Sequence, residues 1–203
     1  SLLNPKVIRD MDLERHGLKV VLRKRDNFLP GDDEYLLAGR NGLTRKEIVR
    51  LNKADGAGYD RYISDLEKVV PILQKWILRA PPEVGAGAHG LPSLLTLGKD
   101  MLGLSTPDIR IVHDFVTRSA GEILDRYFEG DLAKALFGFD GVVGNFASPY
   151  APGSAYVLLH HLFGEAAAVP GAWGHAIGGM GSITQAMARA AREKGADILL
   201  GTP

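Results

Sequence analysis

The amino-acid sequence predicts an α+β fold that is mostly helical and contains a small sheet. Apolar residues recur at helical spacing through the middle of the chain, as in amphipathic helices. Short runs near the two ends, at 18–38 and 172–200, favour strands. With 203 residues, 45% of them apolar and 24% charged, the chain has the length and composition of a globular protein with a substantial core.

The first 38 residues combine a helix signal with strand signals. Asn4 is a good N-cap, and Pro5 suits the first helical position. Gly17 can end that helix, and the run from Pro30 to Asp33 is a turn signal. The elements expected are a helix over 5–16 and strands over 18–23 and 34–38, which form a β-hairpin or meander.

The middle of the chain is expected to be helical. Thr44 and Glu47 have the spacing of a capping box, which opens a helix over 45–52. A long amphipathic helix follows over 54–79, and Pro71 is expected to kink it. Thr106-Pro107-Asp108 is a further start signal, with Thr106 as the cap. The shorter helices are expected over 91–103, 106–117, 119–128, 130–138 and 153–163.

The last 32 residues have the clearest local pattern. A strand is expected over 172–177, a tight glycine turn over 178–181 and a helix over 182–194. Gly195 can take the left-handed conformation that ends such a helix. A second strand is expected over 197–200.

Composition excludes several classes of protein. The 24 basic and 24 acidic residues cancel, which argues against a general nucleic-acid binder, and without cysteine there is no disulfide or Cys-ligated metal site. Only Asp140 and Glu165 are charged between residues 135 and 188, so this stretch is expected to be buried or to face an apolar ligand. Prolines and glycines interrupt it, so no transmembrane segment is predicted. The N-terminus shows no signal-peptide pattern.

The turn at 178–182, Gly-Gly-Met-Gly-Ser, is the most specific local feature. Its glycines allow positive φ and close approach of a ligand or another backbone, and a helix start offers unpaired N–H groups. It does not complete the G-x-G-x-x-G dinucleotide fingerprint, because Thr184 stands at the last position. A turn that faces a functional site and a purely structural turn both stay open.

A pair of adjacent histidines and an aromatic loop are also considered as parts of a functional site. His160 and His161 are adjacent on an expected helix and point roughly 100° apart, so no metal site is predicted there. The aromatic and proline-rich loop at 145–153 either lines a pocket or simply connects two helices.

Three stretches taken together resemble the phytoene-dehydrogenase-like FAD-dependent oxidoreductases. They are residues 3–18, residues 141–163 with Ala147-Ser148-Pro149-Tyr150-Ala151-Pro152-Gly153, and residues 171–182. The resemblance runs in order through nearly the whole chain. It implies that residues 1–203 are the largely substrate-binding portion of a two-domain flavoprotein of the FAD/NAD(P)-binding type, without its N-terminal FAD-binding motif and its C-terminal part.

The resemblance also implies cofactor and site residues. FAD is expected in the full-length parent, and little or none is expected to stay bound to this portion alone. The glycines expected to contact the cofactor are Gly178, Gly179 and Gly181. The residues expected to line the substrate pocket are His160, Trp173, His175, Ile177, Met180 and Ser182. No catalytic acid or base is indicated, and no metal is expected.

Two functions are therefore weighed. The first is the substrate-binding part of an FAD-dependent oxidoreductase that acts on an apolar or amphipathic small molecule. The second is a non-catalytic binding or interaction module that keeps the fold without flavin. Self-association through an exposed domain face is expected, because exposed apolar patches and unpaired strand edges attract partners. The expected location is the cytoplasm, or the mitochondrion if the parent is eukaryotic.

Overall fold

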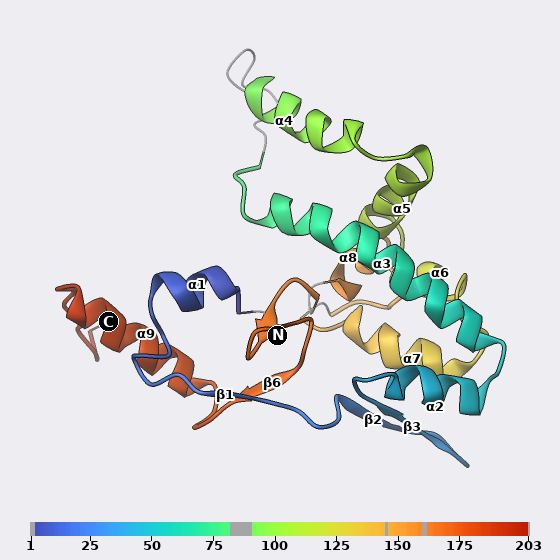
Figure 1. The fold of residues 1–203 in the computed structure, drawn as a ribbon, viewed down its shortest axis with the longest axis horizontal. Helices are drawn as coiled ribbons and strands as arrows, with labels where there is room; N and C mark the ends of the chain where they lie inside the picture. The colour runs from blue at the N-terminus through green and yellow to red at the C-terminus, as the bar shows by residue number, and fades with distance from the viewer. Residues whose placement is uncertain (1–2, 82–90, 145, 160–161, 203) are drawn as a thin grey trace. The chain divides into compact units, whose positions relative to one another are not determined.

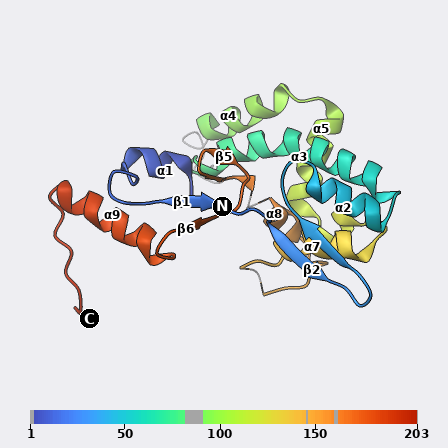
Figure 2. The ribbon, with the colours of Figure 1, turned by 60° about the horizontal axis from the view of Figure 1, so that its bottom comes forward.

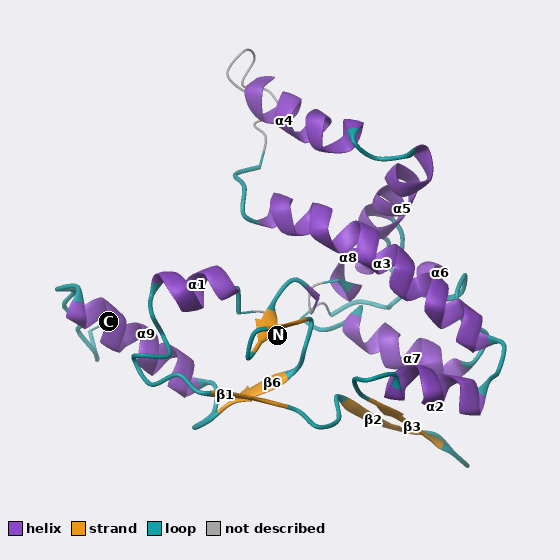
Figure 3. Ribbon diagram, in the orientation of Figure 1, coloured by secondary structure: helices purple, strands orange, loops and turns teal. Residues whose placement is uncertain are grey.

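The computed structural model describes residues 3–81, 91–144, 146–159 and 162–202, and these fall into two compact units (Figure 1). The first unit, here unit 1, comprises residues 1–26 and 160–203, and unit 2 comprises residues 27–159. Helices dominate the described residues, and the strands form small two-stranded antiparallel sheets (Figure 3). The predicted α+β, mostly helical fold class is confirmed.

Unit 1 is a two-stranded sheet with helices packed on one face. Strand β1 (Val20–Leu22) pairs antiparallel with β6 (Gly174–Ala176), with Val21 opposite His175. Figure 2 shows these strands with α1 (Pro5–Asp10) and α9 (Gly181–Glu193). Apolar residues of both helices pack around the core residues Leu13, Leu18, Ala186 and Ala190. The predicted pairing of β1 within a meander over 18–38 was wrong, because β1 pairs with the distant β6.

The ends of the unit 1 helices follow local rules closely. Asn4 caps α1 by accepting a hydrogen bond from the Lys6 amide at 2.8 Å, as predicted. The helix ends earlier than expected, at Asp10, and Gly17 has a positive φ of 89°. Gly195 ends α9 with a φ of 87°, which confirms its expected role. The strand predicted over 197–200 was wrong, since these residues form no regular element.

A small hairpin in unit 1 was not predicted. Strands β4 (Glu165–Ala166) and β5 (Val169–Pro170) are joined through Ala167 and Ala168, whose φ angles are 46° and 60°. Two successive left-handed residues make the tight hairpin turn that usually requires Asn or Gly. Alanine carries no such signal, so the sequence alone did not mark this turn.

Unit 2 opens with a true hairpin. Strand β2 (Asn27–Pro30) pairs with β3 (Tyr35–Ala38), and α2 (Leu43–Leu51) follows. The predicted capping box was wrong, because the Thr44 hydroxyl bonds both the amide and the carbonyl of Gly39, at 2.9 Å and 2.8 Å. This side chain therefore ties the end of the hairpin to the first turn of α2.

The core of unit 2 is built along α3 (Asp55–Ile77). This helix continues through Pro71 and buries one side over most of its length. The fully buried Tyr62 packs edge-on against Tyr127 and Phe128, with ring centroids 5.3 Å and 5.6 Å away, and tilted against Phe137 at 5.0 Å. Aromatic packing of this kind contributes beyond simple area burial.

The remaining helices of unit 2 agree with the prediction in order, although α6 and α8 are shorter than expected. Ser105, not the predicted Thr106, caps α5 by accepting from the Asp108 amide. Buried Asp55 accepts hydrogen bonds from the Glu129 and Gly130 amides at 2.7 Å and 2.9 Å, and so fixes the start of α7. The helices are α4 (Leu91–Leu102), α5 (Thr106–Thr117), α6 (Ala120–Leu124), α7 (Asp131–Asp140) and α8 (Ser154–Leu158).

In the described part of the chain, none of the helices combines the length and the apolar character that crossing a membrane requires.

Candidate functional site

The sheet of unit 1 has one covered and one exposed face. Val20 and Ala176 point to the core, where they pack against its buried residues. Because side chains alternate along a strand, the other face carries Val21, Arg23, Trp173, His175 and Ile177, which we call the β1–β6 face. Val21 and Ile177 are 48% and 56% exposed. This face is therefore an open, partly apolar surface rather than a closed pocket.

Arg23 contacts two other side chains of the β1–β6 face. Its guanidinium lies 5.2 Å from the centroid of the Trp173 ring, a cation–π contact. Its Nε donates a hydrogen bond to His175 Nε2 at 3.0 Å. Arg23 therefore links the Trp173 and His175 side chains on this face. Sequence reasoning missed Arg23, because its place beside His175 depends on a strand pairing that only the fold reveals.

The glycine turn that follows β6 is tightly wound. Gly178 and Gly179 have φ angles of 87° and 79°, which confirms the expected need for glycine there. Ser182 closes the turn by donating its hydroxyl proton to the Gly179 carbonyl at 2.8 Å. Gly181 begins α9 instead of lying within the turn. A Cβ on Gly179 or Gly181 would meet no heavy atom within 4 Å, so this backbone is open to an approaching group.

The structure brings most of the predicted site residues onto one segment. Trp173, His175 and Ile177 share the β1–β6 face, and Met180 beyond them is 77% exposed. Ser182 is half-buried and is engaged in the turn itself. The predicted pocket residue His160 lies outside the described residues. Lining of a substrate pocket by these side chains stays a prediction.

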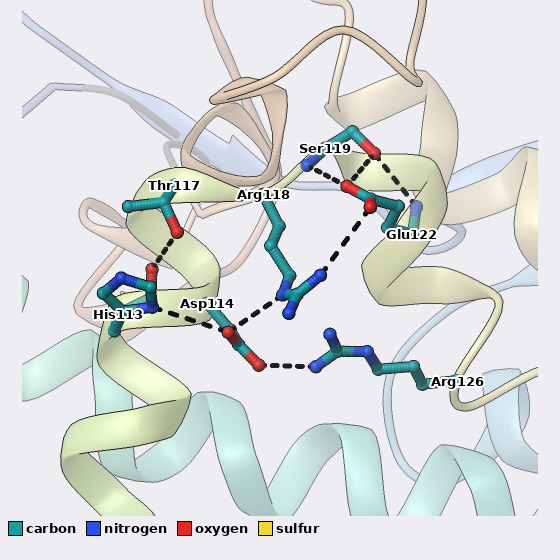
Figure 4. A network of polar contacts seen from close by, with 7 residues as sticks. All are labelled: His113, Asp114, Thr117, Arg118, Ser119, Glu122 and Arg126. Carbon is teal, nitrogen blue, oxygen red and sulfur yellow. Dashed lines mark hydrogen bonds and ion pairs between the residues drawn. The ribbon is translucent and has the colours of Figure 1, made fainter.

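A second polar cluster lies in unit 2, around Asp114 (Figure 4). Its carboxylate accepts from Arg118 Nε at 2.9 Å and from Arg126 at 2.5 Å. Burial alone would raise the pKa of Asp114, but the hydrogen bonds from Arg126 and Arg118 outweigh it and bring the pKa to about 2. A carboxylate this firmly ionised is a poor proton donor or acceptor at neutral pH. The cluster instead ties α5 to α6 and the residues that follow it.

Next to the Asp114 cluster, Ser119 and Glu122 form a reciprocal capping box at the start of α6. This box satisfies backbone donors that would otherwise be unpaired at the helix end. Across the described ranges, no set of three His, Cys, Asp or Glu residues is placed to hold a metal ion.

Comparison with known proteins gives two kinds of relative. Pyridine nucleotide-disulfide oxidoreductase domain-containing protein 2 from Mus musculus and its counterpart from Rattus norvegicus are each 33% identical over 218 aligned positions, which cover 98% of this chain. Uncharacterized protein Rv0897c from Mycobacterium tuberculosis is 38% identical over 73 positions, or 35% of this chain. No family model and no solved structure matches.

The chain spans 37% of the length of the mouse and rat relatives that it matches. The alignment nonetheless takes in both units, the β1–β6 face and the glycine turn, since it leaves out only 2% of this chain. The chain is therefore homologous to a stretch of pyridine nucleotide-disulfide oxidoreductase domain-containing protein 2.

Proposed function

We propose that this chain is part of an FAD-dependent oxidoreductase of the phytoene-dehydrogenase-like kind, and that it supplies walls of an apolar substrate chamber. The observation that carries the proposal is the alignment of 98% of the chain with proteins named for a pyridine nucleotide-disulfide oxidoreductase domain. The earlier resemblance of residues 3–18, 141–163 and 171–182 to FAD-dependent enzymes points the same way.

The β1–β6 face and the glycine turn supply surfaces that suit such a role. Ile177 and Met180 are exposed apolar side chains, and the backbone at Gly179 has open space beside it. An apolar ring system or substrate can lie against such a surface, and glycine permits its close approach. FAD, when bound, supplies the hydride acceptor, and the protein's task is to position the reactants and exclude water.

The fit to FAD is partial. The turn at 178–182 suits contact with an apolar ring, but it lacks the G-x-G-x-x-G pattern that holds a dinucleotide pyrophosphate, since Thr184 stands at its last position. In this proposal, Gly178, Gly179 and Gly181 contact the cofactor, and the phosphate contacts come from other parts of the oxidoreductase.

The test uses the protein expressed from its complete reading frame. We expect the purified protein to show visible flavin absorbance that dithionite bleaches under anaerobic conditions. Gly179→Val should lower the flavin content, because its side chain would occupy the open space beside the turn. Gly195→Val is the matched control. Gly195 also has a positive φ and open surroundings, but it lies at the opposite end of α9.

The second function is a non-catalytic binding module. The half-buried pairing of Arg23 with Trp173 on the β1–β6 face favours it, because Arg and Trp are enriched at the centres of protein interfaces. A complete protein that stays colourless after incubation with FAD, and that copurifies stoichiometrically with a protein partner, would support the module. Flavin loss confined to the Gly179 variant would support the oxidoreductase.

A further inference from the structure

Unit 2 contains a cavity of about 340 Å³ that the proposed function does not use. It lies against α6 and α7, and the loop residues Pro149 and Tyr150 complete its wall. Its lining is almost entirely apolar, chiefly Leu124, Ala135, Phe139 and Val142. The volume is at the lower end of the range found for small-molecule sites. The open question about the loop at 145–153 is thus answered in part, because two of its residues line a pocket.

The wall formed by Tyr150 depends on a specific glycine. A Cβ on Gly121 would lie 2.4 Å from Tyr150 Cε1, so only glycine at this buried position admits the ring. The Gly121 amide also donates to the Pro149 carbonyl at 2.8 Å. Buried Ser154 accepts from the Ala120 amide at 2.9 Å and lies 2.9 Å from the same Pro149 carbonyl. The loop is therefore held against α6 by several independent contacts.

Three polar side chains meet at the edge of this cavity. Asp125 lies 2.8 Å from Lys134 Nζ and accepts a hydrogen bond from the Tyr150 hydroxyl at 3.1 Å. The hydrogen bond from Lys134 lowers the pKa of Asp125, and the bond to Asp125 raises the pKa of Tyr150. At neutral pH the edge thus carries one carboxylate, one ammonium and one neutral phenol, and its net charge is zero.

We propose that this cavity binds a small apolar molecule with a single uncharged hydrogen-bonding head group, such as an alcohol or a ketone. The apolar body packs against Leu124, Phe139 and Val142, and the head group meets the edge at Lys134 and Tyr150. An ammonium has three donors, and Asp125 engages only part of that capacity, so Lys134 can donate to an uncharged oxygen.

Charge explains why the head group is neutral. An anionic ligand would bring its charge beside the Asp125 carboxylate, and a cationic ligand would bring its charge beside Lys134. Either ion would meet one opposite and one like charge at the Asp125–Lys134 pair, so its attraction and repulsion would largely cancel while it still lost hydration. This inference does not depend on flavin, because every residue it uses lies in unit 2.

The test titrates octanol, octanoate and octylamine separately into the protein, and follows binding by calorimetry and by NMR shifts of the α6 and α7 amides. Octanol is expected to bind, and the two charged probes are expected to bind at least about tenfold more weakly. Equal binding of octanoate or octylamine would overturn the neutral head group. Absence of octanol binding to the folded protein would overturn the site.

Matched variants localise the site. Gly138 lines the cavity, and a Cβ there would make only ordinary contact, 3.7 Å from Leu124 Cδ1, so Gly138→Leu can fill the space. We expect it to weaken octanol binding at least about tenfold. The control is Gly98→Leu, a helical glycine in α4 with open surroundings, which should leave octanol binding unchanged.

A second variant that fills the cavity keeps the test decisive if Gly138→Leu does not fold. Ala135 also lines the cavity and is exposed on α7, so Ala135→Leu fills space without straining the helix. Each of these two variants is first checked for native far-ultraviolet circular dichroism. If a variant that keeps the native spectrum binds octanol as tightly as the unchanged protein, the cavity is not the octanol site. Flavin content plays no part in this readout, so failure here is separate from failure of the oxidoreductase proposal.

Discussion

The core of unit 2 contains large buried aromatic rings, whereas the core cluster of unit 1 consists of smaller aliphatic side chains. The largest fully buried side chains of unit 2 include Tyr62, Phe115 and Phe128, and buried Asp55 anchors the start of α7. The core cluster of unit 1 is two leucines and two alanines, with partly buried apolar residues around it.

The difference extends to the surfaces of the two units. In unit 1 one face of a two-stranded sheet is covered by helices, and the β1–β6 face is left exposed with Val21 and Ile177 on it. A two-stranded sheet with one uncovered face is marginal by itself. Unit 2 therefore has the elements of an independent core, whereas unit 1 is better suited to presenting a surface.

The largest predicted effect tests how closely the unit 2 core is packed. A Cβ on Gly58 in α3 would lie 1.7 Å from the Tyr127 carbonyl oxygen. Gly58→Ala should therefore lower the free energy of unfolding by at least about 3 kcal/mol, because backbone must move apart. Gly98→Ala, in a helix with open space, should instead raise it by about 0.5–1 kcal/mol. Urea unfolding followed by circular dichroism measures both, and equal effects would contradict the packing described.

The second prediction concerns Asp140, one of the buried aspartates of unit 2. Burial raises the pKa of Asp140 to about 7, from an ordinary value of 3.8. Ionising it in the folded protein therefore costs stability, and this cost appears as pH rises from about 4 to about 7. Asp140→Asn should raise the free energy of unfolding above about pH 7 by about 2–4 kcal/mol, and should change it little below about pH 4.

Asp114 provides the opposite pH dependence. Its pKa is held at about 2 in the folded protein, so its contribution is complete above about pH 4 and is lost as pH falls toward 2. Asp114→Asn should reduce the pH dependence of the free energy of unfolding between about pH 2 and 4. Asp140→Asn should reduce that dependence between about pH 4 and 7. Urea unfolding across this pH range tests both, and identical curves for the two variants would show that the two environments do not differ.

The smallest expected effect on stability belongs to the exposed face of unit 1. We expect the chain to self-associate through the β1–β6 face and the neighbouring Met180, so the double variant Ile177→Ser and Met180→Ser should weaken association in sedimentation equilibrium. Its free energy of unfolding should change by no more than about 0.5 kcal/mol, because both side chains are exposed. Leu102→Ser, at an exposed apolar position of unit 2, is the control. Equal weakening by the control would show that the β1–β6 face is not the contact.

Local patterns predicted most of the helices but few of the contacts between elements. The periodic apolar residues of α3 and the Asn4 cap of α1 are short-range features, and both were correct. Thr44 was assigned to a capping box because its spacing to Glu47 matched, yet its hydroxyl serves the Gly39 backbone. A pattern can thus locate a helix while missing the partner of its polar side chain.

The candidate sites likewise contain residues that the sequence could identify and residues that it could not. The glycines at 178 and 179 could be identified from sequence, because a strand followed by a glycine-rich helix start requires positive φ. Arg23 and Gly121 could not. Arg23 matters because β1 lies beside β6, and Gly121 because the Tyr150 ring lies against it.

By itself, the sequence determined the α+β class, the order of the main helices and the glycine turn, since these depend on periodicity, caps and local motifs. Only the tertiary structure decided that residues 152 positions apart, Arg23 and His175, share one face, and that the loop at Pro149 and Tyr150 closes a cavity on α6 and α7. The physical reason is that strand pairing uses backbone hydrogen bonds that almost any residue can make. The choice of partner is therefore made by the packing of the whole unit, which no short stretch of sequence encodes.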